Sequence, residues 1–222
     1  MKKGLLLLAA LLHAQILLGA YANHIRYLIA RTKRHQVDYN APSELIEAVG
    51  QIRTTEIINP DLLHEAISAI SDTETFPEVT DNEKILHASI DHFIFVPGFI
   101  ITLQKLLTRL NTHAAKGHLF ELSHALHIRK RYPEETITSF NKLLCAGSIT
   151  RELDLVTPRR VIECKNIDWA RGNTQNLRAQ FKEQSLIAAF NDIPYQIHTK
   201  QEPPKAWREW FKQNNIHCFQ VD

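Results

Sequence analysis

The sequence predicts an α/β fold in which a helical N-terminal region is followed by a mixed β-sheet flanked by helices. From about residue 42 to 110, apolar residues recur at helical spacing. From residue 136 onward, short β-favouring runs alternate with helical segments. The expected order of elements in the second half is α-β-β-β-α-β-α-β, which favours a mixed sheet covered by helices.

Residues 1–22 have the pattern of a secretory signal peptide. Two lysines precede an apolar stretch at 5–18, and Ala20-Tyr21-Ala22 provides the small residues of a cleavage site. We expect cleavage before Asn23, a secreted or periplasmic location, and no stable membrane association of the mature chain. The alternative is an uncleaved inner-membrane anchor, which the shortness of the stretch and its interruption by His13 disfavour.

Residues 23–111 are expected to form a helical region. The segment "PDLLHEAISAI" at 60–70 spaces its apolar residues along one helix face, and Ser43 is a candidate N-cap for the helix that begins "SELIEAVGQI". The acidic stretch 71–83 predicts a loop, and two further apolar-striped segments flank Pro97-Gly98. No motif with a recognised chemistry occurs here, so packing or binding of a protein partner is the expected role.

Residues 112–222 are expected to contain the sheet. A helix over "HAAKGHLFELSHALHIRKRYP" should end before Pro133. The elements predicted after it are strands at 136–144, 152–157 and 160–166, a helix at 174–192, a strand at 194–200, a helix at 204–215 and a strand at 217–221.

The charge is unevenly distributed between the two halves. Residues 116–222 carry 16 Lys and Arg against 12 Asp and Glu, whereas residues 23–115 carry 8 against 12. A polyanion would therefore bind the C-terminal half. The sequence has no G-x-S-x-G elbow, no phosphate-cradling Gly loop and no H-E-x-x-H motif. No motif therefore supports assignment to the hydrolase and kinase classes that these motifs identify.

The three cysteines do not suggest a disulfide framework or a zinc site. Cys145, Cys164 and Cys218 are too few for the former and lack the paired short spacing of the latter. Because each lies in an apolar stretch, all three are expected to be buried small hydrophobic residues.

The segment "LDLVTPRRVIECKN" at 153–166 predicts two strands joined by a turn at Pro158-Arg159. A hairpin centred there places Asp154 opposite Glu163, with about 5 Å between the Cβ atoms. Side chains alternate along a strand, so Lys165 shares the face of Glu163 and Cys164 points to the core. Opposed carboxylates are destabilising unless a cation lies between them, and Mg²⁺ or Mn²⁺ suits such oxygen ligands.

These residues resemble the D…(D/E)-x-K signature of the PD-(D/E)XK nucleases, the restriction-endonuclease-like superfamily. The resemblance covers roughly residues 112–222 and includes the order of elements. It implies a metal-dependent endonuclease that hydrolyses phosphodiester bonds in DNA or RNA. Asp154, Glu163 and the backbone carbonyl of Cys164 would hold the metal, and Lys165 would orient or activate the attacking water.

The resemblance extends to two flanking helices. Glu121 corresponds to the acid that many members carry on the helix before the sheet, where it supports the metal site. Gln180 resembles the glutamine found on the following helix in several branches. The residue before Asp154 is Leu153, where the signature has proline.

Two functions and one competing metal site follow from the sequence. The chain is either an exported nuclease acting as a toxin or effector, or a non-catalytic exported interaction protein built on an inactive nuclease-like fold. Glu121 and His124 have the Glu-x-x-His spacing of di-iron bundles, but a second such pair is missing. His118, His124 and His127 are therefore expected at the surface or in contact with phosphate.

Overall fold

The computed structural model of the chain describes residues 22–33, 41–52, 59–110, 112–170 and 174–221. By its internal contacts the chain divides into two compact units, Met1–Ile90 and Asp91–Asp222. The predicted signal peptide covers residues 1–22 and, apart from Ala22, lies outside the described residues. Within the described ranges, no helix combines the length and apolarity needed to cross a bilayer.

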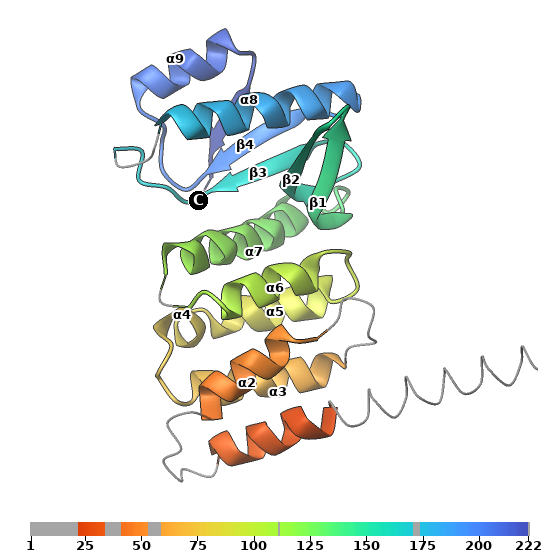
Figure 1. The fold of residues 1–222 in the computed structure, drawn as a ribbon, viewed down its shortest axis with the longest axis vertical. Helices are drawn as coiled ribbons and strands as arrows, with labels where there is room; N and C mark the ends of the chain where they lie inside the picture. Colours follow the sequence, from red (N-terminus) through yellow and green to blue (C-terminus); the bar gives the residue numbers. More distant parts are fainter. Residues whose placement is uncertain (1–21, 34–40, 53–58, 111, 171–173, 222) are drawn as a thin grey trace, which may run out of the picture. The chain divides into compact units, whose positions relative to one another are not determined.

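The described part of the first unit is helical. Residues 22–33 form a helix, and α2 (Ala41–Gly50), α3 (Pro60–Ser71), α4 (Pro77–Thr80) and α5 (Glu83–Phe93) follow, α5 ending in the second unit (Figure 1). α3 starts where its sequence predicts, because Asn59 caps it by accepting a hydrogen bond from the Asp61 N–H at 2.9 Å. Its predicted apolar face is buried, which confirms the periodicity.

Two local predictions in the first unit are wrong. α2 begins at Ala41, so Ser43 lies inside the helix and is not its N-cap. The stretch 71–83 is not entirely a loop, because α4 occupies part of it. Pro77 stands at the first position of α4, where its fixed φ favours a helical turn and its missing N–H costs nothing.

The second unit contains a five-stranded mixed sheet. Its strands are β1 (Ser139–Ala146), β2 (Ile149–Val156), β3 (Val161–Lys165), β4 (Tyr195–Thr199) and β5 (His217–Gln220). They lie in the order β1-β2-β3-β4-β5, antiparallel between β1, β2 and β3 and parallel between β3, β4 and β5. The mixed sheet and the order of its elements confirm the α/β fold class.

Helices cover both faces of this sheet. α7 (His113–Arg131) lies on one face, whereas α8 (Thr174–Phe190) and α9 (Lys205–Gln213) lie on the other (Figure 1). The core beneath α8 and α9 is aromatic: Phe181 of α8 and Trp207 and Phe211 of α9 are buried against Val161 and Ile197 of the sheet. Burial of such side chains, at roughly 1.5–3 kcal/mol each, holds α8 in a fixed place over the sheet.

α6 (Phe99–Leu107) is attached to the sheet through a tight backbone contact. Gly98 precedes it with φ +82°, and a Cβ at this position would lie 1.9 Å from the Phe140 carbonyl oxygen of β1. The Phe140 N–H also donates to the Pro97 carbonyl at 2.8 Å. α6 therefore belongs to the second unit. This unit begins at Asp91, whereas the sequence suggested a boundary after residue 111.

The cysteines differ in their surroundings. Cys164 is buried, as predicted from strand alternation, and Cys218 is half-buried. Cys145 is exposed, so the prediction that all three are buried is wrong. Cys145 lies close to the β1–β2 turn at Gly147, where the end of β1 and the start of β2 are both largely exposed.

Candidate functional site

The predicted β2–β3 hairpin register is present, but its ladder is short. Leu155 pairs with Ile162 and Val156 with Val161, which is the register of a turn centred on Pro158-Arg159. The pairing ends there, so Asp154 and Glu163 are not ladder partners as the sequence predicted. The Asp154 Oδ2 atom instead accepts the Cys164 backbone N–H at 2.7 Å, replacing the carbonyl that a continued strand would supply.

Glu163 is the centre of a buried polar cluster. Its side chain is 2 % exposed, and its Oε1 atom lies 2.5 Å from Lys165 Nζ. Gln180 Nε2 donates to the same oxygen at 2.9 Å, and Gln184 Nε2 donates to Oε2 at 2.8 Å. The predicted residues Glu163, Lys165 and Gln180 are thus brought together, from β3 and α8.

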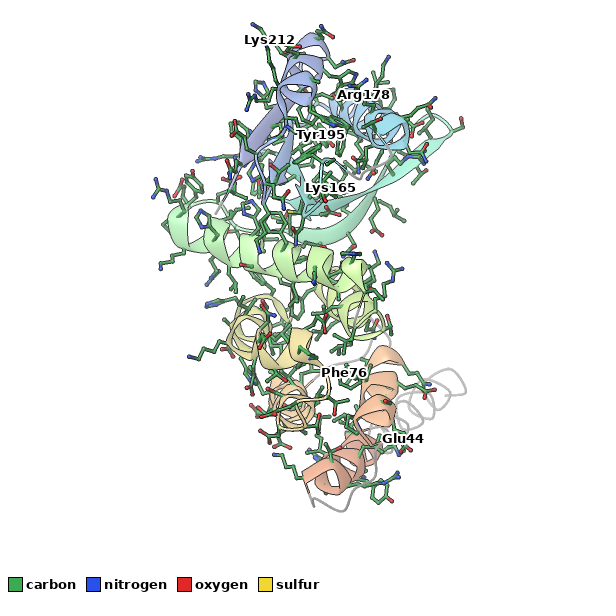
Figure 2. All side chains as sticks on the ribbon, turned by 90° about the vertical axis from the view of Figure 1, so that its left-hand side faces the viewer. Glu44, Phe76, Lys165, Arg178, Tyr195 and Lys212 are labelled. Atoms are coloured by element: carbon green, nitrogen blue, oxygen red, sulfur yellow. The ribbon has the colours of Figure 1, made fainter. Side chains whose placement is uncertain are left out.

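Gln184 and Tyr195 complete this cluster, and the sequence analysis missed both. Gln184 Nε2 also donates to the Glu152 carbonyl at 3.0 Å, and the Tyr195 hydroxyl donates to Gln184 Oε1 at 2.9 Å. Tyr195 and Lys165 lie between α7 and α8 (Figure 2). The signal for Gln184 was available, because residues four apart on a helix share a face and Gln180 was already assigned to the site.

Glu121 is buried beside the cluster on α7. Its Oε1 atom accepts from the Thr102 hydroxyl at 3.2 Å, and its Oε2 atom lies 3.4 Å from His118 Nδ1. Burial raises the pKa of Glu121 to about 8, with a smaller contribution from the Glu163 charge. Burial also lowers the pKa of His118 to about 4, so the imidazole beside Glu121 is neutral at pH 7.

The electrostatics couple the three acids. Burial raises the pKa of Asp154 well above its ordinary value, and the charges of Glu163 and Glu121 raise it further. Burial would lower the pKa of Lys165, but the Glu163 and Asp154 charges outweigh it and raise that pKa. Lys165 therefore remains protonated, and the raised pKa values of Glu121 and Asp154 indicate that the three acids do not all ionise together without a further cation.

The predicted metal donors form no cluster of three or more such side chains. Within the part of the chain that the structure describes, no three His, Cys, Asp or Glu side chains form a metal-binding group. Asp154 and Glu163 provide two carboxylates, and the Cys164 backbone carries a carbonyl. Mg²⁺ commonly binds through one or two carboxylates and retains several waters, so this donor set fits it.

The histidine predictions are only partly correct. His127 is exposed, whereas His124 is 3 % exposed and is not a surface group. His124 Nε2 lies 2.5 Å from His198 Nδ1, on β4. Because β4 joins the sheet through the crossover helix α8, a contact between residues 74 positions apart has no local signal in the sequence.

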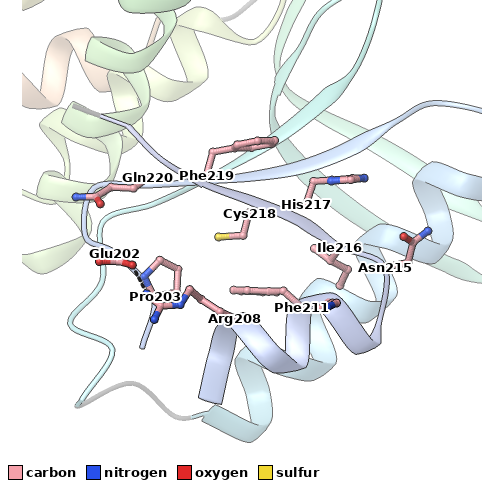
Figure 3. Close-up of a pocket in the computed structure, with 11 residues that line it drawn as sticks. Glu202, Pro203, Arg208, Phe211, Asn215, Ile216, His217, Cys218, Phe219 and Gln220 are labelled. Atoms are coloured by element: carbon pink, nitrogen blue, oxygen red, sulfur yellow. Dashed lines mark hydrogen bonds and ion pairs between the residues drawn. The ribbon is translucent and has the colours of Figure 1, made fainter. Parts of the chain in front are cut away.

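A pocket of about 500 Å³ lies between α9 and β5, away from these side chains (Figure 3). Phe211 and Ile216 form its apolar wall, and an ion pair between Glu202 and Arg208 lies at its edge. None of the predicted site residues lines it.

No protein-family model, curated protein or solved structure matches the chain.

Proposed function

We propose that the second unit is a metal-dependent nuclease with a restriction-endonuclease-like core, formed by α7, β1, β2, β3, α8 and β4. Its reaction is the hydrolysis of phosphodiester bonds in DNA or RNA. The observation that carries the proposal is the cluster of Asp154, Glu163 and Lys165 at the point where β2 leaves β3. Acids that raise one another's pKa are typical of functional sites, because burying them together destabilises the fold.

The side chains have distinct proposed roles. Asp154 and Glu163 hold Mg²⁺ or Mn²⁺ together with the Cys164 carbonyl. Gln180 and Gln184 orient Glu163, since each donates to one of its oxygens. Lys165 stabilises the charge that develops on the phosphate, which requires its ammonium group to turn from Glu163 toward substrate.

A bound Mg²⁺ would supply an activated water and would offset the charge on the phosphate. Glu121 supports the metal site from α7, where Thr102 and His118 contact its two oxygens. Cation binding should lower the raised pKa values of Asp154 and Glu121 and release protons.

We further propose that the protein is exported and acts as a toxin or effector. This rests on the predicted signal peptide, and intact-mass measurement of exported protein tests it. A chain that begins at Asn23 supports the proposal, whereas an unprocessed chain in the inner membrane contradicts it.

One incubation tests the nuclease proposal. The protein is mixed with plasmid DNA and with total RNA, each with Mg²⁺, with Mn²⁺ and with EDTA. We expect cleavage of at least one substrate with either metal and none with EDTA. Intact DNA and RNA under all three conditions would contradict the proposal.

A second candidate function is a non-catalytic exported interaction protein that retains the fold as a scaffold. It is favoured by one observation: Lys165, Gln180 and Gln184 already satisfy both Glu163 oxygens. Calorimetry separates the two functions. A protein that binds neither Mg²⁺ nor Mn²⁺ is a scaffold, and a partner would then bind through the helical region 23–111.

A further inference from the structure

A second pocket of the C-terminal unit has a basic and aromatic lining. It measures about 400 Å³ and lies among the C-terminal half of α7, His198 of β4 and Phe219 of β5. Arg131 and Arg160 line it, and no Asp or Glu is present among its described lining residues. None of the side chains assigned to the nuclease site lines it.

One wall of this pocket is fixed by Arg160. Its guanidinium donates to both oxygens of Glu135, at 2.8 and 2.7 Å, and its Nη1 atom donates to Gln196 Oε1 at 2.7 Å. Burial would raise the pKa of Glu135, but Arg160 lowers it, so the carboxylate stays charged and offsets the guanidinium. Because arginine can only donate, the contact also fixes which end of the Gln196 amide is oxygen.

The orientation of Gln196 determines the tautomers of two histidines. His198 Nε2 lies 3.0 Å from Gln196 Oε1 and must donate to it. Burial lowers the pKa of His198 to about 4 and that of His124 to about 3, so both rings are neutral. His198 Nδ1 is therefore an acceptor, and His124 Nε2 donates to it.

This chain of hydrogen bonds leaves His124 Nδ1 as a bare acceptor. The atom is buried and has no hydrogen-bond partner. A buried unsatisfied acceptor is uncommon in proteins and costs about 1–3 kcal/mol. Because the atom is covered by its own neighbours, this cost belongs to the folded protein and assigns no donor to a ligand.

The pocket also offers a cation and two exposed rings. Arg131 is exposed and makes no ion pair with the described residues, so its charge is available to an anion. Phe219 is 44 % exposed and Tyr132 is 41 % exposed. Exposed aromatic rings beside arginine suit the stacking of a nucleobase and the binding of its phosphate.

We propose that this pocket binds a nucleoside monophosphate group, with the phosphate at Arg131 and the base against Phe219. The group belongs either to a free nucleotide or to the phosphorylated end of a nucleic-acid strand. The inference does not rest on the nuclease proposal, because the pocket shares no side chain with that site.

Calorimetry with EDTA present tests the pocket without any cleavage. The ligands are AMP, adenosine, inorganic phosphate, and a single-stranded oligonucleotide with either a 5′-phosphate or a 5′-hydroxyl. We expect AMP to bind at least tenfold more tightly than adenosine or inorganic phosphate. Binding of AMP alone identifies a free nucleotide as the ligand, and a preference for the 5′-phosphorylated strand identifies a strand end.

Variants locate the binding site. Arg131→Gln should weaken AMP binding at least tenfold, because it removes a charge-assisted contact. Phe219→Leu should weaken AMP binding about tenfold and leave phosphate binding unchanged, because only the base stacks. Arg129→Gln is the matched control: it removes the same charge from the same helix turn, outside the pocket, and should change affinity less than twofold.

Two results would overturn the proposal. One is the absence of binding of both AMP and the phosphorylated strand up to low-millimolar concentration. The other is an equal loss of affinity in Arg131→Gln and Arg129→Gln, which would indicate a general charge effect. An inactive Asp154→Asn variant should bind AMP as the wild type does, so failure of the nuclease proposal leaves this test intact.

Discussion

Asp154 is held in the candidate site because its carboxylate accepts a backbone N–H that a strand carbonyl would otherwise accept. β2 and β3 separate beyond the Leu155–Ile162 pair, at Asp154, which would leave the Cys164 N–H without a partner. The Asp154 carboxylate accepts this N–H and is held next to the strand that carries Glu163 and Lys165. An aspartate is suited to this role because its short side chain reaches a neighbouring strand without much rotamer freedom to lose.

Lys165→Ala should separate catalysis from metal binding. We expect the cleavage rate to fall by orders of magnitude, because the group that stabilises the phosphate charge is lost. Metal affinity should stay the same or rise, since an ammonium group 2.5 Å from Glu163 no longer competes with the cation. Cleavage kinetics and Mg²⁺ calorimetry measure the two effects, with Lys182→Ala on the exposed face of α8 as control.

A Lys165→Ala variant that cleaves at the wild-type rate would contradict this role. So would a large loss of metal affinity, which would mean that Lys165 organises the ligands.

The buried Glu121 should make the fold less stable as pH rises. Its pKa is raised to about 8 from an ordinary value of 4.5, so the folded state holds a proton that the unfolded state releases. The stabilisation is complete below about pH 4.5 and is lost as pH rises toward 8. Thermal melts without metal should therefore show a falling melting temperature over this range, and Glu121→Gln should flatten the fall.

Mg²⁺ provides a second readout of the same effect. It should stabilise the wild type more at pH 8 than at pH 5, because the acids near the cation are then ionised. Glu134→Gln, at an exposed position, controls for net charge and should retain the wild-type pH dependence. An identical pH dependence in Glu121→Gln and wild type would show that Glu121 does not carry the effect.

At the scale of single elements, local patterns in the sequence were informative. α7 ends before Pro133, and α8 shows the helical spacing that its buried residues Phe181 and Ala188 predict. The β2–β3 register followed from a proline turn and strand alternation. The predictions that failed concern the ends of elements. The start of α2 and the short helix α4 depend on one or two residues each, and hydrophobic periodicity does not constrain such short features.

The junction of α6 and β1 gives a prediction about stability. Gly98→Ala should destabilise the protein by more than about 1–2 kcal/mol, the usual cost of a left-handed residue, because the new Cβ also meets the Phe140 carbonyl. Gly117→Ala in α7 is the matched variant, where a Cβ meets nothing within 4 Å. It should stabilise by about 0.5–1 kcal/mol.

Chemical denaturation of the two glycine variants measures both effects. Equal stabilities would contradict the close approach of α6 to β1, since both substitutions add the same methyl group.

At the scale of the whole molecule, the sequence predicted the fold class but only part of the site. The proximity of Asp154, Glu163 and Lys165 could be predicted because they lie in one hairpin. Gln184, Tyr195 and the His124–His198 contact come from elements that the sheet topology brings together, so short-range patterns do not reveal them. The burial of His124 likewise depends on how α7 packs on the sheet, and the helix spacing alone suggested a surface position.

The C-terminal unit therefore combines two chemically different regions. The acids Glu121, Asp154 and Glu163 act on one another electrostatically, with the ammonium group of Lys165 beside Glu163 and that of Lys105 acting on Glu121. The second pocket is lined by arginine, histidine and aromatic side chains and lacks described acids. A cation at the first and a nucleotide phosphate at the second would each complement the charge present.

The central claim is that the acidic cluster exists to bind a catalytic metal, and the Mg²⁺-dependent cleavage rate of Asp154→Asn tests it most directly. The substitution keeps an oxygen that can accept the Cys164 N–H but removes the charge. We predict loss of cleavage in a protein that melts at the wild-type temperature or higher without metal, because the substitution removes the cost of a buried charge that Glu163 and Glu121 repel. Glu183→Gln, at a half-buried acid of α8 that pairs with Arg151, should cleave normally. Cleavage by Asp154→Asn at the wild-type rate would contradict the account.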